Sequence, residues 1–168
     1  DSSIAERSWH NLQLDIGSMI ICNWYRSPSA PDEHMDSFRD ELAYHTQTAI
    51  GCIVVGDINI HHKQWLKYSN ASTPQGISLK AICDDFDLHQ YVDKPTRGPY
   101  LLDLCLSDMH GTKTAIGASI ADHCIVQASI PLALPQETRT PRFIWKFKNA
   151  SWKNVSFGNL RMHLGRTC

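Results

Sequence analysis

The segment Gly56-Asp57-Ile58-Asn59 carries the clearest chemical signal in this sequence. It directly follows the apolar run Cys52–Val55, and a strand end followed by glycine is where an α/β sheet presents ligand-binding groups. Asp57 and Asn59 are two residues apart, so in an extended chain both side chains point to one face. This pair suits phosphoryl chemistry, because a carboxylate can orient a water molecule and an amide can stabilise developing charge. Taken alone, the segment is also an ordinary turn sequence.

Two further segments suggest a carboxylate working with a histidine. Asp122 and His123 are adjacent and precede a second apolar run. Such a pair can supply a metal ligand and a group that transfers protons or binds phosphate, although a surface dipeptide in a loop is the simpler alternative. Asp103 is a lone charge inside the apolar segment Leu101–Leu106. Because a buried charge is costly unless it is paired, we expect His123 to be its partner.

A mixed sheet is the arrangement that could bring these residues together. The continuous apolar runs Met19–Cys22 and Cys52–Val55 predict strands that are buried on both faces. Apolar residues at three- and four-residue spacing predict helices over Asp32–Thr46 and Ile77–Phe86. Strands are also expected over four later segments, namely Leu88–Val92, Leu101–Leu106, Lys113–Ala118 and Cys124–Ile130. Alternating strands and helices followed by further strands indicate an α/β layered sandwich.

The composition is that of an ordinary globular protein. The 168 residues are 42% hydrophobic and 20% charged, and they suit one domain or a large part of one. The formal net charge is −1, so a nucleic-acid partner would be held by local geometry or by a neighbouring domain, not by bulk charge. No apolar run approaches the roughly 18 residues of a membrane span, and we expect no membrane partner. None of the six cysteines is part of a CxxC pair, which favours reduced thiols in an intracellular protein.

The character of the sequence changes after Pro135. The segment 136–142 is polar and contains a proline, which predicts a boundary. The residues after it are rich in Trp and Lys and show no clear period. We therefore predict one domain portion over residues 1–135, and a linker or the start of another module over residues 136–168.

Five motifs in this order resemble the endonuclease/exonuclease/phosphatase superfamily and, within it, the endonuclease domain of non-LTR retrotransposons. The motifs are Tyr25-Arg26-Ser27-Pro28, Gly56-Asp57-Ile58-Asn59, Pro95-Thr96-Arg97, Leu102-Asp103 and Ala121-Asp122-His123. The resemblance covers about residues 18 to 134. It implies a DNase I-like α/β sandwich whose N-terminal strands are missing here. The first strands of the family carry an Asn and a metal-binding Glu, and nothing before Tyr25 supplies them.

The resemblance also implies catalytic roles for five matching residues. Asp57 would orient or deprotonate the attacking water, and Asn59 would stabilise the pentacovalent phosphorane. Tyr25 would hydrogen-bond the phosphate. His123 would contact the scissile phosphate, and Asp103 would fix its tautomer and charge. The residues do not decide whether Asp57 or His123 is the general base.

The implied cofactor is Mg²⁺, with Mn²⁺ as the alternative, and Asp122 would lie near it. The implied activity is the nicking of DNA for retrotransposition, with a reverse transcriptase domain downstream in the full-length polyprotein. Such an element acts inside the cell, in the nucleus. Since the family's Glu is lacking, we expect this chain to be inactive by itself. The alternatives are a catalytically dead fragment and a phosphoesterase of the same fold acting on a phospholipid or inositol phosphate.

Two departures from the family and one further group of residues bear on the site. Ile58 stands where the family has Phe, and Ala121 replaces a Ser whose hydroxyl would brace the loop. His61 and His62 could form a second metal site together with His89 or His110. The favoured interpretation is that His61 and His62 lie in a solvated loop that faces DNA. Trp65 is interpreted as a packing residue, and Arg97 as either a phosphate contact or a solvent-exposed turn residue.

Overall fold

The computed structural model describes residues 6–132, which form a mixed five-stranded sheet covered on both faces. The elements are β1 (Glu6–Leu14), β2 (Gly17–Tyr25), α1 (Glu33–Thr46), β3 (Ala49–Asp57), α2 (Pro74–Asp85), β4 (His89–Gln90), β5 (Asp103–Ser107), β6 (Lys113–Ile120) and β7 (His123–Ser129). The strand order is β1-β2-β3-β5-β4, with β6 and β7 in a separate hairpin. Strands β2 and β3 are parallel, and the other neighbours are antiparallel.

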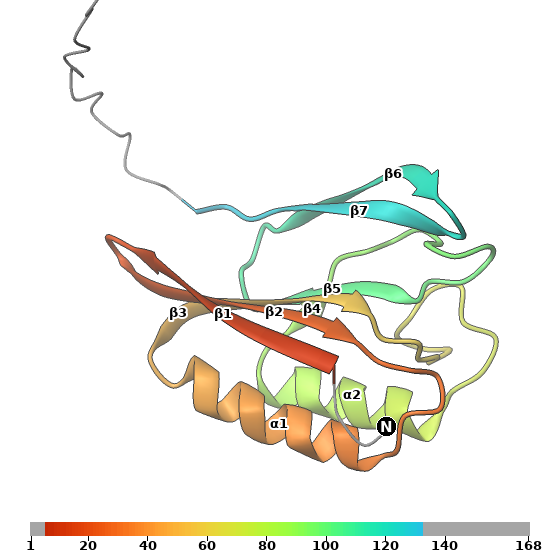
Figure 1. Cartoon of the computed structure of the whole chain (residues 1–168), viewed down its shortest axis with the longest axis horizontal. Helices are drawn as coiled ribbons and strands as arrows, with labels where there is room; N and C mark the ends of the chain where they lie inside the picture. The colour runs from red at the N-terminus through yellow and green to blue at the C-terminus, as the bar shows by residue number, and fades with distance from the viewer. Residues whose placement is uncertain (1–5, 133–168) are drawn as a thin grey trace, which may run out of the picture. The chain divides into compact units, whose positions relative to one another are not determined.

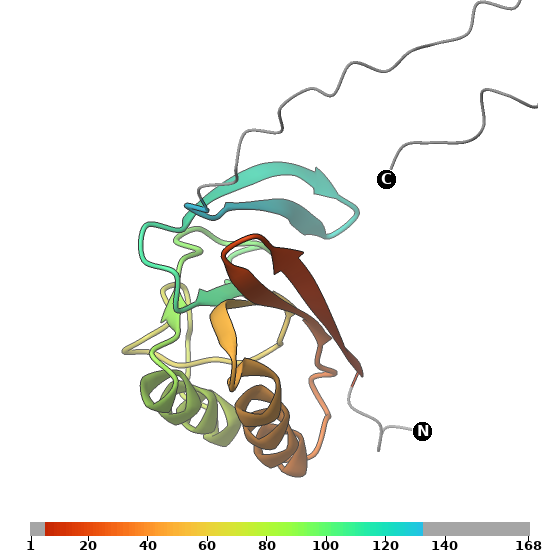
Figure 2. The same ribbon diagram turned by 90° about the vertical axis from the view of Figure 1, so that its left-hand side faces the viewer.

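The molecule has three layers. Helices α1 and α2 lie under one face of the sheet, and the β6–β7 hairpin lies over the other (Figure 1). The view turned by 90° shows the two helices side by side on the side away from the hairpin (Figure 2). This arrangement confirms the α/β sandwich predicted from the sequence.

The main hydrophobic core lies between the sheet and the helices. Helix α1 buries Met35, Phe38 and Leu42, the stripe predicted from their spacing. Phe38 stacks on the buried Trp24 of β2, with their ring centroids 4.4 Å apart. Because this packing fixes the helices against β2 and β3, it also fixes the ends of those strands, where the candidate site residues lie.

Strand β1 is not predicted by the sequence pattern. Most of its side chains are polar and exposed, and Arg7, Trp9 and Leu14 are the three that are partly buried. Arg7 lies over the Trp24 ring, with its guanidinium carbon 5.1 Å from the ring centroid, and it pairs with Glu41 of α1. An edge strand held by a stacked arginine lacks the continuous apolar run on which strand prediction relies.

Helix α2 begins earlier than the sequence pattern indicates, at Pro74 instead of Ile77. Proline suits the first helical position, because the N–H that it lacks would have no helical partner there. The Thr73 side chain caps the helix by accepting a hydrogen bond from the backbone N–H of Gly76 at 3.1 Å. The first turn, Pro74-Gln75-Gly76, adds nothing to the apolar stripe of Leu79 and Ile82, so the sequence pattern misses it.

The β6–β7 hairpin is joined by the two-residue turn Ala121-Asp122. Ala121 has a φ of +56°, a left-handed conformation that is strained for alanine. The hairpin is bonded to the rest of the structure through Cys124, whose N–H donates to the Thr96 carbonyl at 2.8 Å. The Thr114 hydroxyl donates to the Tyr91 carbonyl at 2.7 Å. The Cys124 bond holds the tip of the hairpin, and with it His123, over the sheet, and the Thr114 bond holds the other end of the hairpin.

The described part of the chain contains no helix that is both long enough and apolar enough to span a membrane. The boundary predicted at residue 136 and the linker predicted over 136–168 lie outside the described residues, so both stay predictions.

Candidate active site

Strands β3 and β5 place two aspartates opposite each other at one end of the sheet. Asp57 is the last residue of β3 and Asp103 is the first residue of β5, and the antiparallel register pairs them directly. Side chains of directly opposed residues point to the same face of a sheet. Two neighbouring carboxylates repel each other, so this arrangement favours a proton or a cation close to them.

His123, the first residue of β7, lies between the two carboxylates. Its Nδ1 is 2.8 Å from Oδ2 of Asp103, and its Nε2 is 3.8 Å from Oδ2 of Asp57. The side chains are largely buried, with 27% of His123, 19% of Asp103 and 16% of Asp57 exposed. The Asp103–His123 pair expected from the sequence is therefore present. We call these three residues the Asp57 cluster.

The backbone around Asp57 is fixed by close contacts with β2. Gly56 has a φ of +145°, and a Cβ atom there would lie 1.9 Å from the Trp24 carbonyl oxygen. Only glycine therefore permits this approach. The Arg26 N–H donates to the Asp57 carbonyl at 2.8 Å, and the Asn59 side-chain amide donates to the Arg26 carbonyl at 3.0 Å. Asn59 has a φ of +50°, so the extended geometry assumed from the sequence is wrong at this residue.

The environment of Asp57 favours its protonated form. Burial raises the pKa of Asp57 above its ordinary value of 3.8, and the neighbouring Asp103 raises it further. The Asn59 amide and the charges of His123 and Arg97 oppose this shift. Oδ1 of Asp57 is buried and has no hydrogen-bond partner among the described residues. A buried, unpartnered carboxylate oxygen next to a second carboxylate fits a hard cation, which prefers oxygen ligands.

Asp122 lies in the hairpin turn and is exposed. Its Oδ2 pairs with Nη2 of Arg97 at 2.7 Å. A hydrogen bond from its own backbone and the charge of Arg97 lower the pKa of Asp122. Arg97 is thus an ion-pair partner in this structure, and a metal at Asp122 would compete with it. The metal-ligand role of Asp122 stays a prediction.

Tyr25 is the last residue of β2 and is exposed. The parallel register pairs Asn23 with Val55, and side chains alternate along each strand, so Tyr25 and Asp57 lie on the same face of the sheet. The antiparallel partner of Tyr25 is Glu6, at the start of β1. Register alone connects Tyr25 to the Asp57 cluster, and its contact with phosphate stays a prediction.

Thr96 is a residue of the site that sequence reasoning does not single out, although it belongs to the Pro-Thr-Arg motif. It is completely buried. Its hydroxyl accepts hydrogen bonds from the backbone N–H groups of Leu102 at 3.1 Å and Asp103 at 3.0 Å. Its carbonyl accepts the N–H of Cys124 at 2.8 Å. Thr96 therefore bonds the start of β5 to the start of β7 and sets the spacing between Asp103 and His123.

The histidines outside the motifs do not form the group considered from the sequence. Within residues 6–132, the group of His, Cys, Asp or Glu side chains that could hold a metal ion is Asp87, His89 and His110. His61 instead packs edge-on against Tyr100, and His62 against Trp65. Trp65 itself packs against the hydrophobic core, as the sequence predicts.

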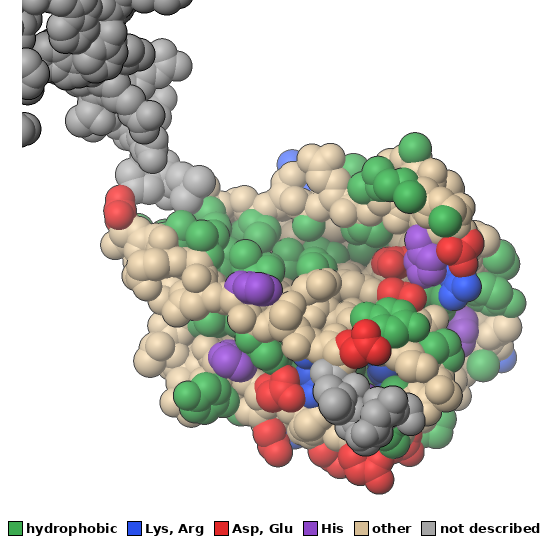
Figure 3. All heavy atoms as spheres, viewed as in Figure 1, with side chains coloured by type: hydrophobic (Ala, Val, Ile, Leu, Met, Phe, Trp, Pro, Cys, Tyr) green, Lys and Arg blue, Asp and Glu red, His purple; other side chains and the backbone are tan. Residues whose placement is uncertain are grey.

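Charged side chains gather where the hairpin tip meets the sheet. Acidic, histidine and basic side chains lie together at this end, and hydrophobic side chains line the rest of the space between the hairpin and the sheet (Figure 3). The arrangement combines carboxylates, an imidazole, an amide and an arginine on rigid strand ends. Such groups can orient water, transfer a proton and contact a phosphate.

Residues 19–127 match the sequence profile of the endonuclease-reverse transcriptase family. The chain belongs to this family. The endonuclease domain of TRAS1, a telomere-specific non-LTR retrotransposon, has a similar structure, with a TM-score of 0.59 and 18% sequence identity. The alignment covers 76% of this chain and 64% of that domain. The chain thus spans less than two thirds of the length of this neighbour, and the likeness at this identity concerns the fold.

Two other solved structures are more distantly similar. The first is mannosyl-6-phosphatase Bt3783 of Bacteroides thetaiotaomicron VPI-5482, with 10% identity and a TM-score of 0.48; the alignment covers 75% of this chain and 57% of that chain. The second is an endonuclease/exonuclease/phosphatase family protein of Bacteroides thetaiotaomicron, with 12% identity and a TM-score of 0.45; the alignment covers 73% of this chain and 52% of that chain. No curated protein sequence matches the chain.

Proposed function

We propose that the Asp57 cluster is part of the active site of a metal-dependent endonuclease that nicks DNA. The observation that carries this proposal is the position of His123, hydrogen-bonded to Asp103 through Nδ1 and facing Asp57 through Nε2. A carboxylate on Nδ1 holds the imidazole in one tautomer and stabilises its charged form. This leaves Nε2 available to a third group.

The spacing within the cluster suggests separate tasks for its members. The 3.8 Å between His123 Nε2 and Asp57 Oδ2 is longer than a hydrogen bond. Asp57 and His123 therefore remain available to different partners, and we assign the attacking water to Asp57 and the phosphate to His123. The Asn59 amide uses one hydrogen on the Arg26 carbonyl. Its second hydrogen faces the Asp57 carboxylate, whose pKa it lowers, and would turn to a phosphate oxygen when substrate binds.

The donor set near Asp57 fits the Mg²⁺ implied by the family. Oδ1 of Asp57 is buried and without a hydrogen-bond partner among the described residues, and its carboxylate faces a second one. Asp57 would contact the ion through Oδ1 and the attacking water through Oδ2, with Asp122 as a further ligand of the ion once its pair with Arg97 opens. When bound, Mg²⁺ or Mn²⁺ neutralises charge on the phosphoryl group. Tyr25, on the same face of the sheet, would hydrogen-bond the phosphate.

DNA is the substrate we propose, in the course of retrotransposition. The support is the family itself, in which an endonuclease accompanies a reverse transcriptase, and the fold shared with the TRAS1 endonuclease domain. A downstream reverse transcriptase domain and a nuclear location of the full-length element belong to the same proposal. The net charge of −1 favours a second candidate substrate, an inositol phosphate or phospholipid headgroup, because binding these needs no extended basic surface.

We further propose that this chain needs additional metal ligands to be active. Mg²⁺ binds through one or two carboxylates together with substrate phosphates, so one absent ligand weakens binding severely. By the family resemblance this ligand would be a Glu on the family's first strands, and the chain covers 64% of the TRAS1 domain. By itself the chain would then be catalytically dead or nearly so.

Nicking of supercoiled plasmid tests this proposal. The chain alone should show no or trace nicking with Mg²⁺ or Mn²⁺. A longer protein that joins it to the first strands of a family member should nick, and Asp57→Asn should lower that rate by about 10²–10⁴-fold, the usual contribution of a general base. A loss of less than tenfold would remove Asp57 from the mechanism. Strong EDTA-sensitive nicking by the chain alone would refute the need for a further metal ligand. Hydrolysis of inositol phosphate without nicking of DNA would select the second candidate substrate.

A further inference from the structure

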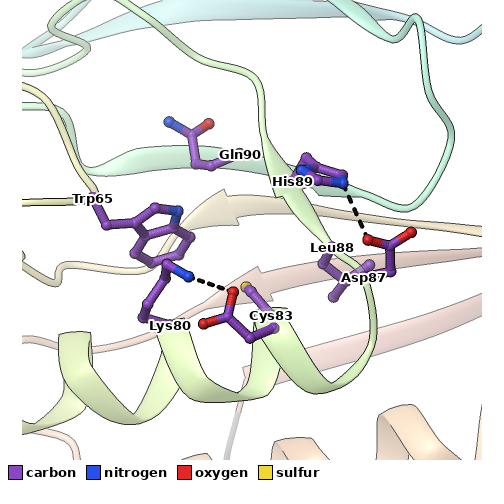
Figure 4. A pocket seen from close by; sticks show the side chains of 8 residues that line it. Trp65, Lys80, Cys83, Asp87, Leu88, His89 and Gln90 are labelled. Atoms are coloured by element: carbon purple, nitrogen blue, oxygen red, sulfur yellow. Dashed lines mark hydrogen bonds and ion pairs between the residues drawn. The ribbon is translucent and has the colours of Figure 1, made fainter.

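A second cluster of histidine and aspartate lies away from the proposed active site. Nε2 of His89 is 3.2 Å from Oδ1 of Asp87, and Nε2 of His110 is 3.8 Å from Oδ2 of the same carboxylate. The three ligand atoms lie within 4.8 Å of one another. Figure 4 shows the His89–Asp87 pair at the edge of a cavity whose wall also includes Lys80 and Trp65. We call these three residues the Asp87 cluster.

The Asp87 cluster is separate from the Asp57 cluster. Asp103 begins β5, whereas His110 follows Ser107, with which the strand ends. The strand therefore puts about 13 Å between Asp103, which pairs with Asp57, and Ser107, which pairs with His89, at roughly 3.3 Å per residue. The residues of the Asp87 cluster come from three different segments: the connection after α2, strand β4 and the loop after β5. None of them belongs to a motif that the family resemblance uses.

We propose that the Asp87 cluster binds a borderline transition-metal ion of the Zn²⁺ class. Two imidazole nitrogens and one carboxylate oxygen form a ligand set that zinc accepts, whereas Mg²⁺ prefers oxygen ligands. In a tetrahedral zinc site with bonds of about 2.0–2.1 Å, neighbouring ligand atoms lie about 3.4 Å apart. Nε2 of His89 is 3.2 Å from Oδ1 of Asp87 and Nε2 of His110 is 3.8 Å from Oδ2, so each imidazole is near this separation from one oxygen of the same carboxylate. Rotation of the exposed His110 side chain would bring its Nε2 to a similar distance from the other two ligand atoms.

Such a site would have a structural consequence and an open coordination position. The ion would connect β4, a strand of only two residues, to the loop that leaves β5. It would add to the pairing of β4 with β5 and to the hydrogen bond from the Tyr91 hydroxyl to the Met109 carbonyl at 3.1 Å. Three protein ligands leave the fourth position of a tetrahedral ion to water.

Titration of ZnCl₂ into the tag-free full chain, followed by isothermal calorimetry, tests the proposal. We expect one ion to bind per chain at this site. Loss of an outer-sphere partner already weakens metal binding by about 10–100-fold, so removal of a ligand by His89→Ala or His110→Ala should weaken it by at least about tenfold. MgCl₂ at the same concentrations should not compete. Added Zn²⁺ should also raise the Tm of the native chain but not that of the His89→Ala/His110→Ala double variant.

Two controls separate this site from the rest of the molecule. His10→Ala removes another exposed histidine, one whose Nε2 is hydrogen-bonded to the Ser8 hydroxyl, and should leave Zn²⁺ binding unchanged. Asp85→Asn removes an exposed carboxylate that pairs with Arg39 and lies outside both clusters, and it should also leave Zn²⁺ binding unchanged. Equal Zn²⁺ affinity in the native chain and the double variant would overturn the proposal. This result does not depend on whether the chain cleaves DNA.

Discussion

The Asp57 and Asp87 clusters contain the same two residue types near opposite ends of β5, but their surroundings differ. The side chains of the Asp57 cluster are 16 to 27% exposed, and those of the Asp87 cluster are 51 to 74% exposed. Burial raises the pKa of Asp57 and makes its carboxylate receptive to a proton or a hard cation. An exposed cluster keeps its hydration, so it gains little from ion pairing alone. Residue types by themselves therefore do not decide what such a cluster does.

The backbone that carries the two clusters differs as well. Asp57, Asp103 and His123 stand at the ends of strands that are tied together by Gly56 and Thr96. The Asp87 cluster is carried by two connecting segments and the shortest strand. Chemistry on a phosphate requires groups held in place before the substrate arrives. Capture of a metal ion tolerates side chains that move into position, so the second arrangement suits binding more than catalysis.

Among the variants that compare the two clusters, the largest effect should come from breaking the Asp103–His123 pair. In the longer, nicking-competent protein, Asp103→Asn and His123→Ala should each lower the nicking rate by about 10²-fold, within the range of general acid–base contributions. The double variant should be little worse than either single variant, because residues that act as one unit are not additive. Initial rates on supercoiled plasmid measure all three.

The matched variants in the other cluster test the contrast directly. Asp87→Asn and His110→Ala exchange the same residue types and should leave the nicking rate within about twofold of native, since surface substitutions away from the site have small effects. Additive losses for Asp103→Asn and His123→Ala would show that the two do not act as a pair. A large loss for Asp87→Asn would mean that the two clusters are not independent.

A smaller effect, on stability, should follow from removing the hydroxyl of Thr96. Thr96→Val leaves the buried N–H groups of Leu102 and Asp103 without their acceptor. An unpaired buried group costs about 1–3 kcal/mol, and we expect the free energy of unfolding to fall by at least this amount in urea titrations. Thr96→Ser keeps the hydroxyl and should retain most of the stability.

Thr112, next to the Asp87 cluster, provides the comparison for Thr96. Its hydroxyl donates to the Met109 carbonyl, which also accepts the Thr112 N–H and the Tyr91 hydroxyl. Thr112→Val therefore leaves no acceptor unpaired and should destabilise the protein less than Thr96→Val. Equal losses for the two variants would show that the Thr96 hydroxyl has no special part in joining β5 to β7.

The features that the sequence predicts well are those with a local signal. Strand β3 is predicted because Cys52–Val55 is a continuous apolar run, and α1 is predicted to within one residue of its start because its buried stripe is regular. The contact between Asp103 and His123 is predicted on energetic grounds, since a charge within an apolar strand needs a partner. Their catalytic roles rest on the family resemblance and stay predictions.

The features that the sequence does not reveal depend on tertiary register. Strand β1 is stabilised by the stacked Arg7, which no periodicity marks. The role of Thr96 depends on the pairing of segments from three parts of the chain. Likewise, Asp87 and His110 are 23 residues apart in the sequence and meet because β4 pairs with β5. Spacing along the chain carries no information about such contacts.

The smallest effect should be a gain in stability when Asp57 loses its charge. Its pKa is raised by burial, so the folded protein binds this proton more tightly than the unfolded chain does. The stabilisation from this group is full below the ordinary value of 3.8 and is lost as pH rises through the raised folded value. At pH 7 in EDTA, Asp57→Asn should therefore unfold at a higher temperature than the native chain, and the difference should shrink towards pH 4. Asp87→Asn should give no such gain, because its side chain stays hydrated. A lower Tm for Asp57→Asn at pH 7 would show that attraction between the Asp57 carboxylate and His123 outweighs the cost of burying that charge. The two clusters would then differ in geometry and not in the effect of burial on their carboxylates.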